Sequence, residues 1–369
     1  MSQGSSPPVD PGRLCGFLVL DKPAGITSHG CVSAVRRAYG LRRVGHGGTL
    51  DPAVTGVLPI AIGPATRLLP YLQGSKVYRG AVQLGVRTSS DDLQGSVLSR
   101  QEVPALTSAD VEQVLEGFRG PILQRPPQVS AVHVDGERAY ARARRGETLE
   151  LQERPVTIER LELLAWDPAR GVLELEVRCT AGTYIRSLAR DLGESIGCGG
   201  ALASLRRTGA LGFDLAAAVP LERLRELPPP PLRDPLEALS HLERHQLTPD
   251  ELLSWRCGRR LQLGGRPGGS AAGEIGGDSG LASGSAAEAA GGSRAGPPPA
   301  DLEQAAAASD TVVPSVEPAA DPEPAAPAAP DGLASRPVAV LDPDGHLAGI
   351  AQCAPGGELR PRLVFDAAG

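Results

Sequence analysis

One aspartate lies in a loop made almost entirely of small residues, within the sequence GHGGTLDPAVTG at positions 45–56. Pro52 favours an extended conformation for Asp51 and stiffens the loop. The glycines allow a large planar ligand to approach the backbone. An Asp-Pro pair also opens many ordinary turns, so a structural turn is the alternative. A rigid, partly desolvated carboxylate suits catalysis, and Asp51 is therefore our candidate catalytic residue.

Other chemistries lack part of the motif that they need. The loop has neither GxxxxGK[ST] nor GxGxxG, so it does not indicate nucleotide binding. HGG occurs in esterase oxyanion loops, but the chain contains no GxSxG elbow. His46 has no further ligands at metal-binding spacing, and the six cysteines form no CxxC pair. We therefore expect no metal site and reduced, mostly buried cysteines.

Charge is distributed unevenly along the chain. Residues 264–335 contain ten acids and two bases, so the remainder sums to +2 although the whole chain carries −6. Arginines cluster at 36–37, 42–43, 138–145, 206–207 and 256–260. Guanidinium groups suit phosphates, so these clusters favour a nucleic-acid partner. Solvated helix faces are the alternative.

The elements expected to hold the Asp51 loop are a strand at Phe17–Leu20, a helix within 27–40 capped by Thr27 or Ser28 and closed by Gly40, and a buried strand at 57–63. In 76–88 the alternation predicts a strand with Tyr78 on one face and Arg79 on the other.

Further along, the patterns predict a capped helix at 107–120, a basic excursion from the sheet at 124–155 and a strand at 171–180. A helix at 182–197 and a short helix at 199–209 follow. Strands and helices without a regular βαβ rhythm indicate a mixed α+β domain that ends near residue 240. Residues 264–335 cannot bury enough apolar surface to fold, and 336–369 reads as short strands with a turn at DPDG.

Several motifs occur in the order seen in one enzyme family: LVLDKPAGITSH, GHGGTLDPAVTGVLPIAIGPATR, KVYRGAVQLGVRT, QRPPQVSAVHVDGERAY, GTYIRSLARDLG and LRRTGALGF. Together they resemble the TruB family of bacterial tRNA pseudouridine-55 synthases. Gly47 stands where that family usually has threonine, Val129 where it has an aromatic residue, and His133 where it has lysine.

The resemblance implies a role for each matching residue. Asp51 would be the catalytic aspartate, Tyr78 the ring that stacks on the target base, and Arg186 the partner of the aspartate. Leu205 would form an apolar wall of the pocket, and His46 would take the place of the flipped base. Gly48 and Thr49 beside it would also contact the substrate, as would the arginine run Arg142, Arg144 and Arg145.

The implied reaction needs no added atoms or electrons. It breaks the N1–C1′ bond of uridine, turns the base over, joins C5 to C1′ and sheds the C5 proton, so we expect no cofactor. A carboxylate can stabilise charge at C1′, attack C1′ or remove the C2′ proton, and these routes stay open. The nucleotide must leave the RNA stack to react.

Composition and the resemblance together imply an organisation for the chain. We expect a disordered N-terminus at 1–12, a catalytic domain at 13–240 with a mainly antiparallel sheet flanked by helices, and an RNA-gripping excursion at 124–155. A small PUA-like β module would comprise 241–263 and 336–369, interrupted by a disordered acidic insert at 264–335. No membrane segment or export signal is visible, and we expect a cytoplasmic monomer that binds the T stem-loop of tRNA without a protein partner. The alternatives are a synthase of the same superfamily for another RNA and a non-catalytic RNA-binding or RNA-folding protein.

Overall fold

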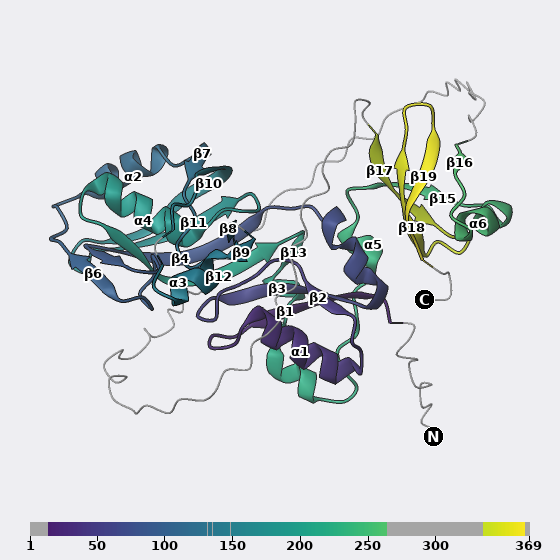
Figure 1. Cartoon of the computed structure of the whole chain (residues 1–369), viewed down its shortest axis with the longest axis horizontal. Coiled ribbons are helices and arrows are strands. Elements are labelled where there is room, and N and C mark those ends of the chain that lie inside the picture. The colour runs from purple at the N-terminus through teal and green to yellow at the C-terminus, as the bar shows by residue number, and fades with distance from the viewer. Residues whose placement is uncertain (1–13, 131, 135, 148, 264–334, 366–369) are drawn as a thin grey trace, which may run out of the picture. The chain divides into compact units, whose positions relative to one another are not determined.

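The computed structural model describes residues 14–263 and 335–365, except 131, 135 and 148 (Figure 1). The predicted N-terminal tail and nearly all of the acidic insert lie outside these residues. The described part contains a ten-stranded sheet and a separate five-stranded sheet. No helix among the described residues is long and apolar enough to cross a membrane.

The large sheet has the order β14-β1-β3-β12-β4-β11-β10-β7, with β2 paired to β3 and β13 to β12. Only β1–β14 and β3–β12 pair in parallel. The sheet is therefore mixed and mainly antiparallel, as expected from the sequence. Its strands are β1 (Gly16–Lys22), β2 (Val44–His46), β3 (Thr55–Ile62), β4 (Lys76–Leu84), β7 (Gly120–Gln124), β10 (Arg154–Asp167), β11 (Val172–Cys179), β12 (Gly200–Ala210), β13 (Phe213–Asp214) and β14 (Val219–Pro220).

The longer helices beside this sheet can be followed in Figure 1. They are α1 (Ser28–Tyr39), α2 (Ser108–Glu116) and α4 (Ile185–Ile196). Helix α4 contacts β12 and β4, whereas α1 contacts β2. Leu18 and Leu20 of β1 belong to one buried cluster, while Phe17 and Val19 belong to another. Burial of both faces explains why β1 reads as a continuous apolar run.

Local signals set the ends of α1. The Thr27 side chain accepts a hydrogen bond from the backbone N–H of Gly30, and Gly40 closes the helix at φ 65°. Both ends were predicted. A capped start of α2 was also predicted, and the structure shows a capping box of Thr107 and Asp110 there; the expected end at Gly120 is wrong, because the helix ends at Glu116 and Gly120 opens β7.

The predicted short helix at 199–209 is also wrong, because these residues form β12. Alanine, leucine and arginine favour helices intrinsically, yet this segment fills the gap between β3 and β4 and pairs with both. Pairing on two sides outweighs the small difference in helix propensity.

Smaller elements complete the chain. They are β5 (Val86–Thr88), β6 (Val97–Arg100), β8 (His133–Val134), β9 (Glu137–Arg138), α3 (Ala139–Arg144), α5 (Pro235–Ala238), and the 3₁₀ helices η2 (Gly63–Tyr71), η3 (Leu215–Ala217) and η4 (Leu221–Arg225). The basic segment leaves the large sheet at Gln124 and returns at Arg154, and these two residues pair with each other.

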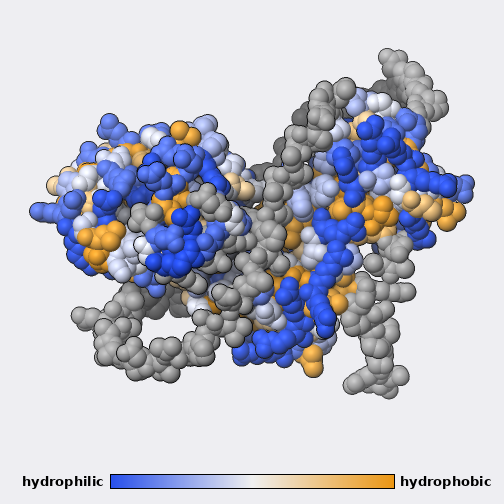
Figure 2. Space-filling model, in the orientation of Figure 1, coloured by the Kyte–Doolittle hydropathy of each residue, from blue (hydrophilic) through white to orange (hydrophobic). Residues whose placement is uncertain are grey.

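The second sheet has the order β15-β17-β18-β19-β16. It contains β15 (Glu243–Gln246), β16 (Leu261–Gln262), β17 (Arg336–Leu341), β18 (Leu347–Cys353) and β19 (Glu358–Val364), with α6 (Pro249–Arg256) between β15 and β16. Trp255 of α6 is fully buried in the core of this sheet. Segments from both sides of residues 264–334 therefore build one small β unit. Hydrophilic side chains dominate the visible surface of the molecule (Figure 2).

Candidate active site

Asp51 lies in the loop between β2 and β3, and a buried lysine holds this loop from behind. Lys22 is fully buried, and its Nζ donates hydrogen bonds to the carbonyl oxygens of Pro52 at 3.0 Å and Val54 at 2.6 Å. Burial lowers the pKa of the Lys22 ammonium, whereas the nearby Asp51 carboxylate opposes this change. Lys22 thus fixes the backbone on the C-terminal side of Asp51.

The first residue of α1 fixes the other side of the loop. The Ser28 hydroxyl donates to the carbonyl oxygen of Leu50 at 3.1 Å and accepts from the backbone N–H of Leu50 at 2.8 Å. The Gly25 N–H also donates to the carbonyl oxygen of Pro52. The motif LDKPAGITS therefore serves to position the Asp51 loop.

An ion pair joins Asp51 to Arg186, one residue into α4. Arg186 Nη2 lies 2.9 Å from Asp51 Oδ2. The Arg186 side chain is only 9% exposed, whereas that of Asp51 is 44% exposed. Coulomb attraction between the opposite charges holds the two side chains together. Solvent and ligands can reach the carboxylate, while the cation is held within the protein.

Arg186 has further partners that orient its planar group. Nη1 donates to the carbonyl oxygen of Ser90 at 3.2 Å, and Nη2 donates to that of Val129 at 3.0 Å. Nε lies 3.8 Å from the carboxylate of Asp92. Sequence reasoning missed Asp92, although the acidic pair directly after β5 in TSSDDLQG was a usable signal.

Tyr78 lies on β4 and is 6% exposed. It pairs across the sheet with Arg207 of β12. Burial raises the pKa of the Tyr78 hydroxyl, and the positive charge of Arg207 opposes this shift. The phenol is therefore neutral at physiological pH. Stacking of a base on this ring requires the ring to become accessible.

Leu205 of β12 pairs with Gly80 of β4. With Gly80 and Ile185 it lines an apolar cavity of about 10 Å³. This volume holds about one water molecule. Entry of a nucleobase therefore requires side chains to move.

The remaining predicted loop residues lie between β2 and Asp51. His46 is half-buried at the end of β2, and Thr49 is exposed. The carbonyl oxygen of Gly48 accepts a hydrogen bond from the fully buried Arg207. A Cβ atom at Gly47 would lie 2.5 Å from Leu211 Cδ1. Leu211 thus fills the space that a larger residue at position 47 would need.

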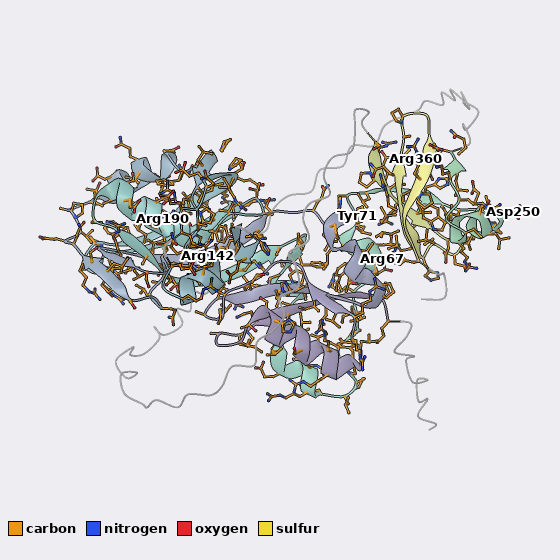
Figure 3. The ribbon with its side chains drawn as sticks, in the orientation of Figure 1. Arg67, Tyr71, Arg142, Arg190, Asp250 and Arg360 are labelled. Carbon is orange, nitrogen blue, oxygen red and sulfur yellow. The ribbon has the colours of Figure 1, made fainter. Side chains whose placement is uncertain are left out.

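The arginine run lies at and just after α3, within the excursion; Figure 3 labels Arg142. Arg142 Nε lies 2.7 Å from Glu147, and Arg145 forms ion pairs with Glu137 and Glu147. The side chain of Arg144 lies outside the described residues. A phosphate that binds this run must therefore compete with glutamates.

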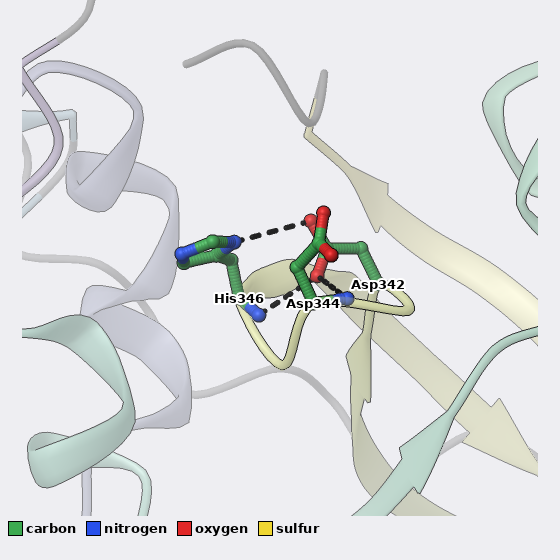
Figure 4. A group of neighbouring side chains, drawn as sticks. All are labelled: Asp342, Asp344 and His346. Carbon is green, nitrogen blue, oxygen red and sulfur yellow. Dashed lines mark hydrogen bonds and ion pairs between the residues drawn. The ribbon is translucent and has the colours of Figure 1, made fainter.

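One candidate cation group occurs among the described residues, in the turn between β17 and β18 (Figure 4). It consists of Asp342, Asp344 and His346. Asp342 Oδ1 accepts the backbone N–H groups of the other two residues at 2.9 and 2.8 Å. These bonds stabilise an ordinary turn and fully account for the cluster.

Comparisons with known proteins match most of the folded chain. The model of the TruB family pseudouridylate synthase N-terminal domain matches residues 36–185, and that of the tRNA pseudouridylate synthase B C-terminal domain matches 186–229. A tRNA pseudouridine synthase B of Parasynechococcus marenigrum is 68% identical over 69% of this chain and 87% of its own length. That of Synechococcus sp. strain WH7803 is 63% identical over 68% of this chain and 85% of its own length.

Solved structures agree on the fold. An H/ACA ribonucleoprotein bound to a substrate RNA containing 2′-deoxyuridine has a TM-score of 0.59 at 19% identity, covering 96% of this chain and 86% of that one. A Cbf5-Nop10-Gar1 complex has a TM-score of 0.52 at 27% identity, covering 66% and 67%.

Proposed function

Because the chain belongs to the TruB family of pseudouridylate synthases, we propose that it isomerises uridine to pseudouridine in tRNA, at position 55 of the T loop, with Asp51 as the catalytic residue. The observation that carries this proposal is the ion pair of an accessible carboxylate with a buried guanidinium, at 2.9 Å, on a loop clamped by Lys22 and Ser28.

The geometry suits chemistry at the glycosidic bond. Asp51 can act on C1′ or C2′ of a flipped nucleotide. It can stabilise positive charge at C1′, attack C1′ or remove the C2′ proton, and each of these routes requires an ionised carboxylate. Arg186 lies beside that carboxylate, and its hydrogen bonds to the carbonyl oxygens of Ser90 and Val129 fix its orientation. In all routes the N1–C1′ bond breaks, the C5–C1′ bond forms, and the C5 proton is exchanged for one on N1.

Other residues bind and orient the base. Tyr78 would stack on it, which is worth about 1–3 kcal/mol, and Leu205 would contact its edge. His46 would fill the place that the base leaves, beside Gly48 and Thr49. The arginines of the excursion, Arg142, Arg144 and Arg145, would contact the RNA stem after phosphates displace Glu137 and Glu147.

The enzyme would act as a cytoplasmic monomer on tRNA alone, without a guide RNA or protein partner. The bacterial relatives at 63–68% identity support this choice over the H/ACA complexes at 19–27%. The five-stranded sheet at residues 243–364 would serve as the PUA-like module.

The test is tritium release from C5-labelled uridine in transcribed tRNA incubated with the purified chain only. We expect release equivalent to one uridine per tRNA, lost when U55 is replaced by cytidine. Asp51→Asn should bind tRNA and release no tritium. Release that persists in the U55C transcript would reject the position, and turnover by Asp51→Asn would reject the catalytic role.

A further inference from the structure

Four arginines flank the turn between α1 and β2. Arg36 and Arg37 lie in the last turn of α1, Gly40 reverses the chain, and Arg42 and Arg43 lead into β2. Residues Arg36, Arg37, Gly40, Leu41 and Arg42 line an open hollow of about 440 Å³. We call these four arginines the α1 arginine cluster.

No carboxylate of the described residues forms an ion pair with this cluster. Residues 22–50 contain no aspartate or glutamate. In the part of the chain that the structure describes, none of the four arginines forms an ion pair: Arg36 donates to the carbonyl oxygen of Val44, and Arg43 donates to the hydroxyl of Thr66. Both acceptors are neutral, so the hydrogen bonds orient the guanidinium groups and leave the positive charge in place.

The contrast with the excursion is informative. Arg142 and Arg145 are ion-paired with Glu147 and Glu137, whereas Arg37, Arg42 and Arg43 are exposed to solvent and have no such partner among residues 14–263 and 335–365 as described. An anion that binds the α1 arginine cluster displaces only water and counterions. Phosphates are the anions that arginine forks bind best.

The cluster is close to the active site along the same two elements. Ser28 at the start of α1 contacts the Asp51 loop, and Arg36 and Arg37 follow eight and nine residues later, so these two arginines lie about 12–14 Å from that contact along the helix. Along β2, a strand of three residues, the distance from Arg43 to His46 is about 10 Å.

Stabilisation of helix α1 is an alternative role for half of the cluster. Cations in the last turn of a helix stabilise its dipole by about 0.3–1 kcal/mol. That reading covers Arg36 and Arg37 but not Arg42 and Arg43, which lie beyond the helix. It also predicts an effect on stability and none on RNA binding.

We propose that the α1 arginine cluster is a second RNA-contact surface, which binds backbone phosphates of the tRNA near the target uridine. The proposal rests on the proposed function only in taking tRNA as the ligand. It assigns RNA binding to a surface outside both the Asp51 pocket and the basic excursion.

The test is the double variant Arg37→Gln/Arg42→Gln, which leaves the hydrogen bonds of Arg36 and Arg43 intact. Fluorescence anisotropy with labelled tRNA across a KCl series gives the dissociation constant and its salt slope. Each lost phosphate contact should lower the slope by about 0.7–0.9. We therefore expect a fall of about 1.5 in slope and at least tenfold weaker binding near 0.1 M salt, with the rate at saturating tRNA and the melting temperature unchanged.

Two variants serve as controls. Arg160→Gln/Arg178→Gln removes the same charge from the exposed face of β10 and β11 and should change binding less than twofold. Arg37→Lys/Arg42→Lys keeps the charge and should keep the salt slope. A wild-type slope in the glutamine variant, or equal losses in the glutamine and lysine variants, would overturn the proposal. Absence of pseudouridine formation by the wild type would instead reject the proposed function, because binding is measured separately.

Discussion

In the Asp51–Arg186 pair, the carboxylate is exposed and the guanidinium is buried. The carboxylate is open to substrate, while the guanidinium is held by Ser90, Val129 and Asp92. An arginine with several fixed acceptors cannot be replaced by a single point charge.

We therefore expect Arg186→Lys to lower kcat by at least 100-fold while changing tRNA affinity less than threefold, because a lysine cannot reach Asp51 and both carbonyl oxygens together. Single-turnover kinetics with excess enzyme would measure this. The matched control is Arg190→Lys. Arg190 (labelled in Figure 3) lies one helical turn further along α4 and is paired with Asp91 and Asp191. A similar loss in the control would show that helix placement, not the Asp51 contact, is what lysine disturbs.

Tyr39 gives a prediction about pH. Its hydroxyl donates to the carbonyl oxygen of Pro230, and burial raises its pKa to about 12. In the unfolded chain the pKa is about 10, so the unfolded state loses the proton first as pH rises. The folded state then binds more protons, and stability falls between pH 10 and 12.

The wild-type advantage over Tyr39→Phe in unfolding free energy should shrink by about 1–2 kcal/mol between pH 9.5 and 11.5. Urea denaturation of both proteins at each pH measures this, and the other titrating groups cancel in the difference. An advantage that stays constant over this range would mean that Tyr39 ionises equally in both states.

At the scale of elements, β12 brings residues of β4 and of the Asp51 loop close together, although they lie far apart in the sequence. It places Leu205 beside Gly80 and Arg207 beside Tyr78, and Arg207 reaches the Asp51 loop through Gly48. Gly56 of β3 packs directly against this strand: its φ is 104°, and a Cβ atom there would lie 2.1 Å from the carbonyl oxygen of Arg207.

Gly56→Ala should therefore destabilise the protein by about 3 kcal/mol or more, since the cost of a positive φ and the cost of the clash with the backbone add together. Gly120→Ala is the control, because Gly120 also has a positive φ of 82° but no atom within 4 Å of the added methyl. It should cost only about 1–2 kcal/mol. Chemical denaturation of both variants measures the loss of unfolding free energy in each. Equal losses would show that β12 can move away from the added methyl group with little loss of stability.

The sequence predicted the elements whose signals are local. Thr27 and Gly40 mark the ends of α1, and the alternation of β4 places Tyr78 on the buried face. It failed for β12, where neighbouring strands decide the conformation. It also missed Asp92, because the contact with Arg186 joins residues 94 positions apart through the fold. The pairing of Asp51 with Arg186 was inferred from family resemblance, since nothing in either segment alone implies it.

At the scale of the whole molecule, this chain is longer than its Parasynechococcus relative. The 253 matched residues make up 87% of the Parasynechococcus protein, which is therefore about 290 residues long. This chain without residues 264–335 is about 300 residues long. The two family models end at residue 229, before that segment. The segment carries −8, while the remainder carries +2.

We expect deletion of residues 264–335, closed by a short Gly-Ser linker between Leu263 and Arg336, to leave the rate at saturating tRNA unchanged. Residues on both sides of the cut already belong to one sheet through β16, β17, β18 and β19, and loop-closure entropy varies slowly with length. Removal of eight net negative charges should tighten tRNA binding severalfold at 0.05 M salt. The gain should vanish near 1 M, where the screening length is about 3 Å.

A full-length variant with the ten acids of this segment changed to asparagine or glutamine separates charge from length. If charge alone matters, this variant and the deletion will show the same tighter binding at low salt and the same wild-type rate. If the deletion loses activity while the neutralised variant keeps it, the segment is needed for its length or its contacts. If neither variant binds tRNA more tightly at low salt, the negative segment does not oppose RNA binding, and the electrostatic argument for this chain fails.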